Sequence, residues 1–275
     1  MTTSGGGDFP ASLLLVGAGR MGSALLQGWL KLGLEPARVH VLDPAPSPEV
    51  QAFCAARGVK LSAPAMPPEV LVLAIKPQTL AGAAPALAAL TAPTTLVISI
   101  VAGKTLKTLA EHLPSAGAFV RAMPNLPAAI GAGITGAVAD PAVTPAQRQK
   151  AQALLAAVGR VEWLGEEDLI DAVTAVSGSG PAYVFYLAEC LAEAGVAQGL
   201  PPTVAEQLAR ATIEGAGALL AALPEATAAK LRADVTSPGG TTEAALAELT
   251  GGDALRELIG RAVAAARRRA QQLSG

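Results

Sequence analysis

The chain has 275 residues, of which 22 are acidic and 20 are basic, so its formal net charge is −2. This balance argues against a broad basic surface for nucleic acid, and we expect no nucleic-acid partner. Only 15% of the residues are charged and 51% are apolar, so a monomer would expose much apolar surface and we expect an oligomer. The two cysteines, Cys54 and Cys190, match neither a disulfide framework nor a metal site, which favours a reducing compartment and a cytoplasmic location.

The N-terminal half alternates short apolar runs with helical stretches up to about residue 164. The runs are 13–16, 39–42, 70–75, 96–101, 119–122 and 133–138. Continuous apolar strands separated by Ala-rich helices indicate a parallel sheet covered on both faces. We therefore predict an α/β fold that begins with a Rossmann-like, doubly wound domain over residues 1–165.

A glycine-rich motif follows the first run and opens a helix predicted over 21–32. The motif consists of Gly17, Ala18, Gly19, Arg20, Met21 and Gly22. In such a motif the glycines permit a tight turn, close approach to a pyrophosphate and close packing of helix on strand. Asp43 ends the second run 21 residues beyond Gly22. This context predicts a dinucleotide site in which Asp43 holds a ribose 2′-hydroxyl. Arg20 and Arg38 are close in sequence and could neutralise a 2′-phosphate, so the choice between NADH and NADPH stays open.

Two segments bear on membrane targeting. The first ten residues contain no Lys or Arg and therefore lack the charged start of a signal peptide. The uncharged stretch 77–103 is long enough to span a bilayer, but Pro85 and Pro93 interrupt it. This stretch predicts a helix followed by a buried strand, and we expect no membrane segment.

The second half, residues 166–275, is predicted to be an all-helical domain of about five or six helices. Breaks are expected at 178–181, 199–202, 223–224, 237–240 and 251–252. The first long helix, predicted over 182–198, is polar only at Glu189, Glu193 and Gln198. A helix that is apolar nearly all round must be buried nearly all round, so we predict that two copies pair through this domain as a homodimer.

Residues 234–243 open a later helix, predicted to run to about residue 249. Ser237 is its candidate N-cap, with Pro238 at the next position. Residues 239–242 would then present first-turn N–H groups and hydroxyls suited to a carboxylate. The alternative is a helix start that binds no ligand.

The chain has few residues suited to acid-base catalysis or to binding a metal ion. The only histidines, His40 and His112, fall in the predicted nucleotide domain. No grouping of His, Cys, Asp and Glu has the spacing of a metal site, so we expect no metal. The sequence favours a hydride transfer that needs little help from side-chain acids.

With these motifs in their observed order, the chain resembles the pyrroline-5-carboxylate reductases, which perform the last step of proline biosynthesis. The similar segments are 17–22, 74–77, 99–103, 121–125, 171–183 and 234–242. The resemblance extends from residue 13 to about residue 273. It implies NADPH- or NADH-dependent reduction of the C=N bond of 1-pyrroline-5-carboxylate to L-proline, by dimers that often assemble further into decamers.

The resemblance also implies site residues. Thr242 would lie near the ring nitrogen as a catalytic proton donor or hydrogen-bond partner, and Glu225, matched by counting back, would contact the substrate. The substrate carboxylate would be held by Ser237, Gly240, Thr241 and Thr242. The cofactor cleft would further contain Ala74, Ile75, Lys76, Pro77, Val101, Ala102 and Asn125.

Two other functions share parts of this pattern. A two-domain 3-hydroxyacid dehydrogenase would need a lysine on the first long helix of the helical domain, and 182–198 contains none. A non-catalytic dinucleotide sensor would need no substrate cradle, whereas 237–242 looks intact. Within the resembled family the second strand commonly ends in small polar residues, so Asp43-Pro44 shifts the expectation mildly toward NADH, whereas the resemblance itself still favours NADPH.

Overall fold

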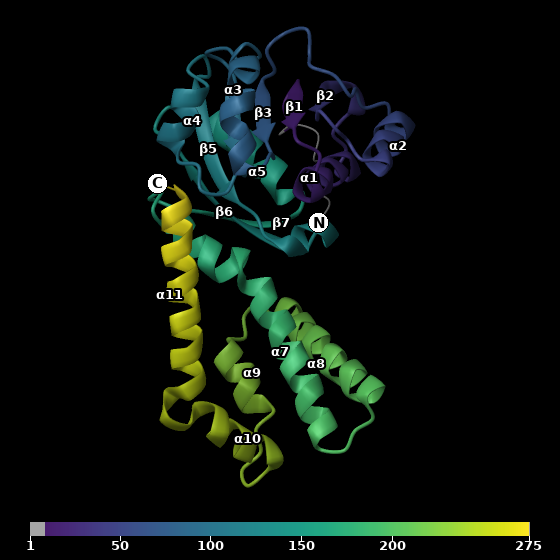
Figure 1. Cartoon of the computed structure of the whole chain (residues 1–275), viewed down its shortest axis with the longest axis vertical. Helices are drawn as coiled ribbons and strands as arrows, with labels where there is room; N and C mark the ends of the chain where they lie inside the picture. Colours follow the sequence, from purple (N-terminus) through teal and green to yellow (C-terminus); the bar gives the residue numbers. More distant parts are fainter. Residues whose placement is uncertain (1–8, 275) are drawn as a thin grey trace. The chain divides into compact units, whose positions relative to one another are not determined.

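The computed structural model describes residues 9–274 and divides the chain into two compact units (Figure 1). Unit 1 contains residues up to Gly178 together with the C-terminal segment from Ala266, and unit 2 is Ser179–Ala265. The predicted domain boundary at 165/166 stays a prediction. The chain crosses between its compact units after residue 178 and returns to the first after residue 265.

The described residues of unit 1 form a seven-stranded sheet of order β2-β1-β3-β4-β5-β6-β7. Its strands are β1 (Leu13–Val16), β2 (Val39–Leu42), β3 (Val70–Leu73), β4 (Leu96–Ser99), β5 (Ala118–Met123), β6 (Gly133–Ala139) and β7 (Gly159–Trp163). All six predicted runs are strands, and the first five are parallel. The doubly wound, mostly parallel sheet is confirmed, and the one antiparallel pair among its described strands is that of β6 with β5.

The prediction also missed β7, which pairs in parallel with β6. This strand alternates half-buried and exposed residues in the sequence GRVEW. An edge strand with one solvated face lacks the continuous apolar run that reveals an interior strand. The sequence also did not predict that β6 is antiparallel to β5, since an apolar run carries no information about strand direction.

Helices cover both faces of the sheet, as Figure 1 shows. One face packs against α1 (Arg20–Lys31), α2 (Pro48–Arg57) and α5 (Pro145–Ala156), and the other against α3 (Leu80–Ala88) and α4 (Leu106–His112). Successive residues of β1 point to opposite cores, Leu13 and Leu15 to the first and Leu14 and Val16 to the second. Burial on both faces explains why these strands are continuously apolar.

Local signals in the sequence set several helix ends in unit 1. Ser47 caps α2 through its hydroxyl, and Gly58 ends that helix in the left-handed region with φ of 72°. Thr144 and Gln147 form a reciprocal capping box at the start of α5. These ends need no tertiary contact, which is why the sequence could predict them.

The stretch 77–103 contains α3 and β4, as predicted from its prolines. Pro85 lies inside α3, and β4 is buried along its whole length. Within residues 9–274, no helix combines the length and the apolar character needed to cross a membrane.

The described part of unit 2 contains α7 (Gly180–Ala197), α8 (Pro202–Ala222), α9 (Ala228–Asp234) and α10 (Thr241–Thr250), and α11 (Ala254–Ser274) begins in it. The prediction of an all-helical second half is confirmed. The break expected at 178–181 is short, because α6 (Leu169–Val173) continues through a π-helical turn (Thr174–Gly178) and only Ser179 separates this turn from α7. The passage from unit 1 to unit 2 follows directly after this wider helical turn, between Gly178 and Ser179.

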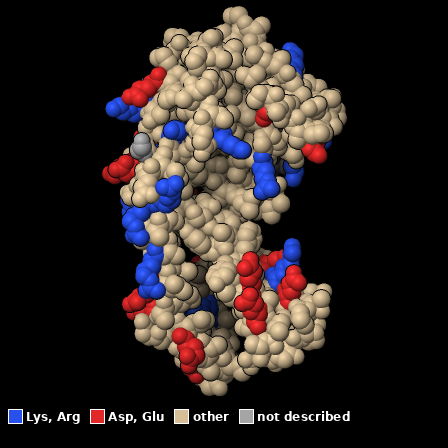
Figure 2. Space-filling view, in the orientation of Figure 1, with Lys and Arg blue, Asp and Glu red and all other residues tan. Residues whose placement is uncertain are grey.

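Unit 2 buries very little of its apolar surface within the single chain. Its only buried side chains among the described residues are Ala205 and Ala209, and α7 has none. Its large apolar residues are exposed instead, including Phe185, Tyr186 and Leu187 on α7. Figure 2 shows charged side chains only as scattered groups on a largely uncharged face.

Candidate active site

The glycine-rich loop is the best-defined element of the candidate site. Glycine is favoured at each of its three glycine positions for a different physical reason. Gly17 has φ of +91°, and a Cβ there would lie 2.6 Å from the carbonyl oxygen of Ala74. A Cβ on Gly22 would lie 2.1 Å from the carbonyl oxygen of Gly17. Around Gly19 a Cβ would meet nothing within 4 Å. The first and last glycines therefore close the turn, and the middle one leaves space for a ligand to approach the backbone.

Helix α1 begins directly at this loop. It starts at Arg20, one residue before the predicted start, and Gly19 caps it without any side-chain hydrogen bond. The first N–H groups of a helix have no partner within the helix, and the helix dipole is positive at this end. The loop can therefore bind a pyrophosphate through its backbone, and the residues present fit a dinucleotide.

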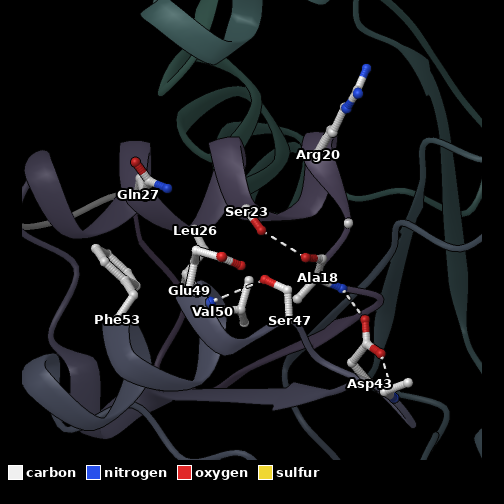
Figure 3. A pocket seen from close by; sticks show the side chains of 12 residues that line it. Ala18, Arg20, Ser23, Leu26, Gln27, Asp43, Ser47, Glu49, Val50 and Phe53 are labelled. Carbon is white, nitrogen blue, oxygen red and sulfur yellow. Dashed lines mark hydrogen bonds between the residues drawn. The ribbon is translucent and has the colours of Figure 1, made fainter.

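Asp43 fixes the glycine-rich loop to the end of β2 (Figure 3). Its Oδ2 atom accepts a hydrogen bond of 2.7 Å from the Ala18 N–H, and its Oδ1 atom accepts one of 2.9 Å from the Ala45 N–H. The predicted contact of Asp43 with a ribose hydroxyl stays a prediction. The Asp43 carboxylate also has a positioning role, since it holds the glycine-rich turn in place.

A cavity of about 400 Å³ opens beside the loop. It lies between the start of α1, the end of β2 and the first turns of α2 (Figure 3). Its lining residues are Ala18, Gly19, Arg20, Ser23, Leu26, Gln27, Asp43, Ala45, Ser47, Glu49, Val50 and Phe53. A cavity that joins the glycine-rich loop to the end of β2 is where the adenosine half of a dinucleotide binds in folds of this type.

The other predicted cofactor residues lie at the same edge of the sheet. Ala74 to Pro77 follow β3, Val101 and Ala102 follow β4, and Asn125 follows β5. These strands are parallel to β1, so their carboxyl ends share one edge with the glycine-rich loop. The chain passes from β1 to β2 on one side and to β3 on the other, and ligands of doubly wound sheets bind at such a reversal.

Asn125 has a structural partner in addition to its predicted place in the cleft. Its Oδ1 atom accepts a hydrogen bond of 3.0 Å from the Ile134 N–H, at the start of β6. The side chain thus ties the end of β5 to the strand that reverses direction. One residue of the segment 121–125, on which the family resemblance partly rests, therefore also stabilises the antiparallel part of the sheet through a hydrogen bond.

The predicted substrate segment lies in unit 2, and its details differ from the prediction. Ser237 is not the N-cap, because α10 begins at Thr241 and its cap is Gly240, without a side-chain hydrogen bond. Residues 237–240 instead form a turn in which the Gly240 N–H donates to the Ser237 carbonyl. Gly239 adopts φ of +71°, which a regular helix start at Ser237 would not allow.

Part of the predicted anion cradle is already paired within the chain. The Gly239 N–H donates a hydrogen bond of 2.7 Å to the Glu243 carboxylate, which lies in the first turn of α10. The groups left at the helix start are the N–H groups and hydroxyls of Thr241 and Thr242, of which Thr242 is half-buried. Glu225 is exposed in the loop between α8 and α9.

Sequence reasoning missed the residues contributed to the cavity by α2, in particular Ser47, Glu49 and Phe53. The available signal was the Ser-Pro-Glu start of a helix directly after the second strand. Arg38, considered as a phosphate partner, instead pairs with Glu35 at 2.8 Å and does not line the cavity. Among the residues that line it, Arg20 is the only cation.

The histidines are engaged in backbone contacts away from the cavity. Nδ1 of His40 lies 3.0 Å from the Ser62 carbonyl oxygen, and Nδ1 of His112 lies 2.8 Å from that of Thr108. In the part of the chain that the structure describes, no group of three His, Cys, Asp or Glu residues could hold a metal ion.

Comparison with known proteins assigns the family. Residues 167–273 match the family model described as pyrroline-5-carboxylate reductase dimerisation. The pyrroline-5-carboxylate reductase of Synechocystis is 47% identical over 205 residues, which cover 74% of this chain and 75% of that protein. The chain belongs to the pyrroline-5-carboxylate reductase family. It is accordingly an NAD(P)-dependent oxidoreductase, and residues 12–103 match a model described as NADP oxidoreductase, coenzyme F420-dependent.

Solved structures extend the match to the whole fold. A pyrroline-5-carboxylate reductase from Coxiella burnetii has a TM-score of 0.88 and 36% identity, covering 97% of this chain and 99% of its own. A pyrroline carboxylate reductase from Plasmodium falciparum, solved with NADP bound, has a TM-score of 0.79 over 96% of this chain and 98% of its own. At 24% identity the latter shows the fold alone. Membership of the reductase family therefore rests on both units.

Proposed function

We propose that this chain reduces the C=N bond of 1-pyrroline-5-carboxylate to L-proline with NADPH or NADH, as the last step of proline biosynthesis. The observation that carries the proposal is the cavity beside the glycine-rich loop, in a chain that belongs to the reductase family. The bound cofactor supplies a hydride. Every other requirement falls on residues of this chain.

The nucleotide side is assigned to the edge of the sheet in unit 1. Backbone N–H groups of residues 17–22 would bind the pyrophosphate, and Asp43 holds that loop in its conformation. Lys76, Pro77, Val101 and Ala102 would line the nicotinamide side. Their positions after β3 and β4 support this assignment, because both strands end at the edge that carries the glycine-rich loop.

The substrate side is assigned to the start of α10. N–H groups and hydroxyls of Thr241 and Thr242, with the turn from Ser237 to Gly240, would bind the substrate carboxylate. Thr242 would hydrogen-bond the ring nitrogen. The Gly239 N–H is paired with the Glu243 carboxylate, so it is not among the proposed donors to the substrate carboxylate. The N–H groups and hydroxyls at the start of α10 remain as the main donors.

The chemistry suits a site without a strong acid. A protonated imine accepts hydride at carbon directly, so the protein mainly has to bind and orient two ligands. Correct orientation alone can contribute about 7–11 kcal/mol to lowering the barrier. Thr242 can tune the nitrogen through a hydrogen bond without being ionised.

Substitution of Thr242 tests the role of this residue. We expect Thr242→Ala to lower kcat about 10–100-fold, the loss typical of one directed hydrogen bond at a reacting centre, while NADH binding changes less than twofold. Thr250→Ala is the matched control, because the Thr250 hydroxyl donates to the Leu246 carbonyl within the same helix. Unchanged turnover in Thr242→Ala would remove this residue from the mechanism.

The reductase proposal itself is tested with the unmodified protein. Oxidation of NADH or NADPH should depend on added 1-pyrroline-5-carboxylate and yield proline. Binding of the nucleotide without any turnover would overturn the reductase activity and favour the sensor alternative.

We also assign an assembly and a location. Unit 2 would mediate a homodimer, and its unburied α7 supports this assignment. Further assembly into decamers and residence in the cytoplasm complete the proposal. Cys54 and Cys190 are both free thiols, in accord with a reducing compartment.

A further inference from the structure

The adenosine end of the cavity carries an anion of its own at the start of α2. Ser47 caps this helix, Pro48 occupies its first position and Glu49 lies in the first turn. Hydrogen bonds from the Ser47 hydroxyl and from its own backbone N–H lower the pKa of Glu49 below its ordinary value. Glu49 therefore places an anion at a helix start, where the helix dipole would otherwise favour a phosphate.

The charges that face this end of the cavity are predominantly negative. Asp43 and Glu49 both line it, and Arg20 is the only cation among its lining residues. In Figure 3 the Glu49 carboxylate is turned toward Ser47, whereas the Arg20 guanidinium extends away from both carboxylates. Arg38 is held by Glu35 outside the lining, and the guanidinium of Arg57 lies over the outer Phe53 ring, 5.7 Å from its centre.

A nucleotide with a free ribose and one with a 2′-phosphate differ by nearly two negative charges at this place. The free ribose adds hydroxyl groups, which can donate to carboxylates. A 2′-phosphate would have to lie near Asp43 and Glu49, because both line the cavity and Glu49 occupies the first turn of α2. The end of β2 is where the adenosine ribose binds in this fold, so this repulsion acts on the atoms that distinguish the two cofactors.

We propose that this chain is selective for NADH over NADPH, and that Glu49 is the residue that excludes the 2′-phosphate. The inference deepens the proposed reductase function and rests on it for the reaction. Glu49 acts as an internal anion at the helix start that a 2′-phosphate would need. Asp43 contributes less specifically, because its carboxylate is shared with the Ala18 and Ala45 N–H groups.

Equilibrium binding separates this selectivity from turnover. NADH and NADPH are titrated against the full chain by nucleotide fluorescence in the absence of substrate. We expect the Kd for NADPH to exceed that for NADH by about tenfold, as two like charges close to a partly solvated phosphate would produce. An equal or tighter Kd for NADPH overturns the inference.

Three variants assign the effect to its residue. Glu49→Gln should lower the Kd for NADPH by about fivefold and leave that for NADH within twofold, because one exposed charge is removed. Glu49→Ala should lower it at least as much, since it also frees the first turn of α2. Glu162→Gln removes an equal charge from an exposed position on β7, outside the cavity lining, and should change neither Kd.

The variants also decide between charge and shape. If Glu49→Gln leaves the ratio of the two Kd values unchanged, Glu49 is not the determinant and the inference fails. The difference between NADH and NADPH should shrink at high ionic strength, because exposed charges are screened over about 10 Å at 0.1 M salt. A ratio that is constant with salt would contradict an electrostatic origin.

The same preparations distinguish the failure of this inference from that of the reductase proposal. Turnover with both cofactors but tighter NADPH binding would leave the reductase standing and remove the NADH preference. Selective NADH binding without turnover would do the reverse. The ratio of kcat/KM for the two cofactors should follow the ratio of their Kd values in the active protein.

Discussion

The two units of the chain satisfy their apolar surface in different ways. In unit 1, β1, β3, β4 and β5 are buried along their whole length, and helices on both faces complete two cores within one chain. In unit 2, α7 leaves all of its residues at least partly exposed. The comparison teaches that the nucleotide-binding unit completes its cores within one chain, whereas the helical unit leaves most of its apolar surface exposed.

The difference also explains where the sequence was informative. Within unit 1, burial by the chain itself imposes a regular pattern of strands and caps. Within unit 2, large apolar side chains are exposed in the single chain, and the proposed homodimer would cover them. The match to a dimerisation family over residues 167–273 agrees with that division.

The largest expected effect breaks the core of unit 1. Trp29 is completely buried, and its Nε1 donates a hydrogen bond of 2.8 Å to the Leu154 carbonyl. Trp29→Ala should lower the free energy of unfolding by about 3–5 kcal/mol, because it leaves a cavity and an unpaired carbonyl. Denaturant titration measures this loss. Trp29→Phe should cost less, and Leu208→Ala, on an exposed position of α8, should cost little in the monomer.

The second prediction concerns the homodimer proposed for unit 2. Phe185 is 55% exposed in the single chain. Phe185→Asp should weaken dimerisation by at least about 100-fold, since an unpaired carboxylate would be buried at the interface. Light scattering after size exclusion should then report a monomer that still binds NADH. Met66→Asp, in an exposed loop of unit 1, is the control and should leave the mass of the particle in solution unchanged. If Phe185→Asp also left this mass unchanged, α7 would not lie at an interface.

A third prediction concerns the ion cluster where the C-terminal segment joins unit 1. Arg121 on β5 is buried and pairs with Glu167 at 3.0 Å and with Asp171 at 3.4 Å. The Ser274 hydroxyl also contacts Arg121 and donates to Asp171, so the last turn of α11 takes part in the cluster. This tie connects chain segments more than 100 residues apart.

Removal of the Arg121 cation should leave the carboxylates of Glu167 and Asp171 without the cation that pairs with them. Arg121→Met should destabilise the protein by about 2–3 kcal/mol, below the range for fully buried pairs because Glu167 is partly solvated. The shift in the denaturant midpoint measures the loss. Arg160→Met, at an exposed position of β7, is the matched control. Equal stability of the two variants would show that the cluster contributes nothing.

The smallest expected effect is a pH dependence at Glu69. Burial alone would raise the pKa of Glu69, but hydrogen bonds from Lys150 and from the Ala11 N–H outweigh it and lower the pKa. The folded pKa lies below the unfolded value, so this stabilisation is present above the unfolded pKa and is lost as the pH falls through the folded one.

Glu69→Gln should therefore be less stable than the unmodified protein at pH 7, by less than about 1 kcal/mol because the pair is partly exposed. The difference should disappear as the pH falls below about 4. Unfolding curves at several pH values measure it. A difference that persists undiminished at pH 3 would assign the effect to packing rather than to charge.

The sequence by itself determined the features that depend on short-range patterns. Continuous apolar runs identified the six strands from β1 to β6, and the spacing of Gly17, Gly19 and Gly22 identified the tight turn before α1. Helix signals such as Thr144 before Pro145 and Gly58 after α2 also act within a few residues. Periodicity and backbone sterics are local, so they can be recognised without knowledge of the partners in space.

Tertiary structure alone decided the rest. The direction of β6, the engagement of Asp43 by the Ala18 N–H and the meeting of Arg121 with Ser274 all depend on residues distant in the chain. The Ser237 prediction failed for a related reason: a Ser-Pro pair permits a helix start, but the Glu243 carboxylate stabilises a turn there and moves the start to Thr241. The sequence shows that a polar side chain can form hydrogen bonds, but only the fold determines which group becomes its partner.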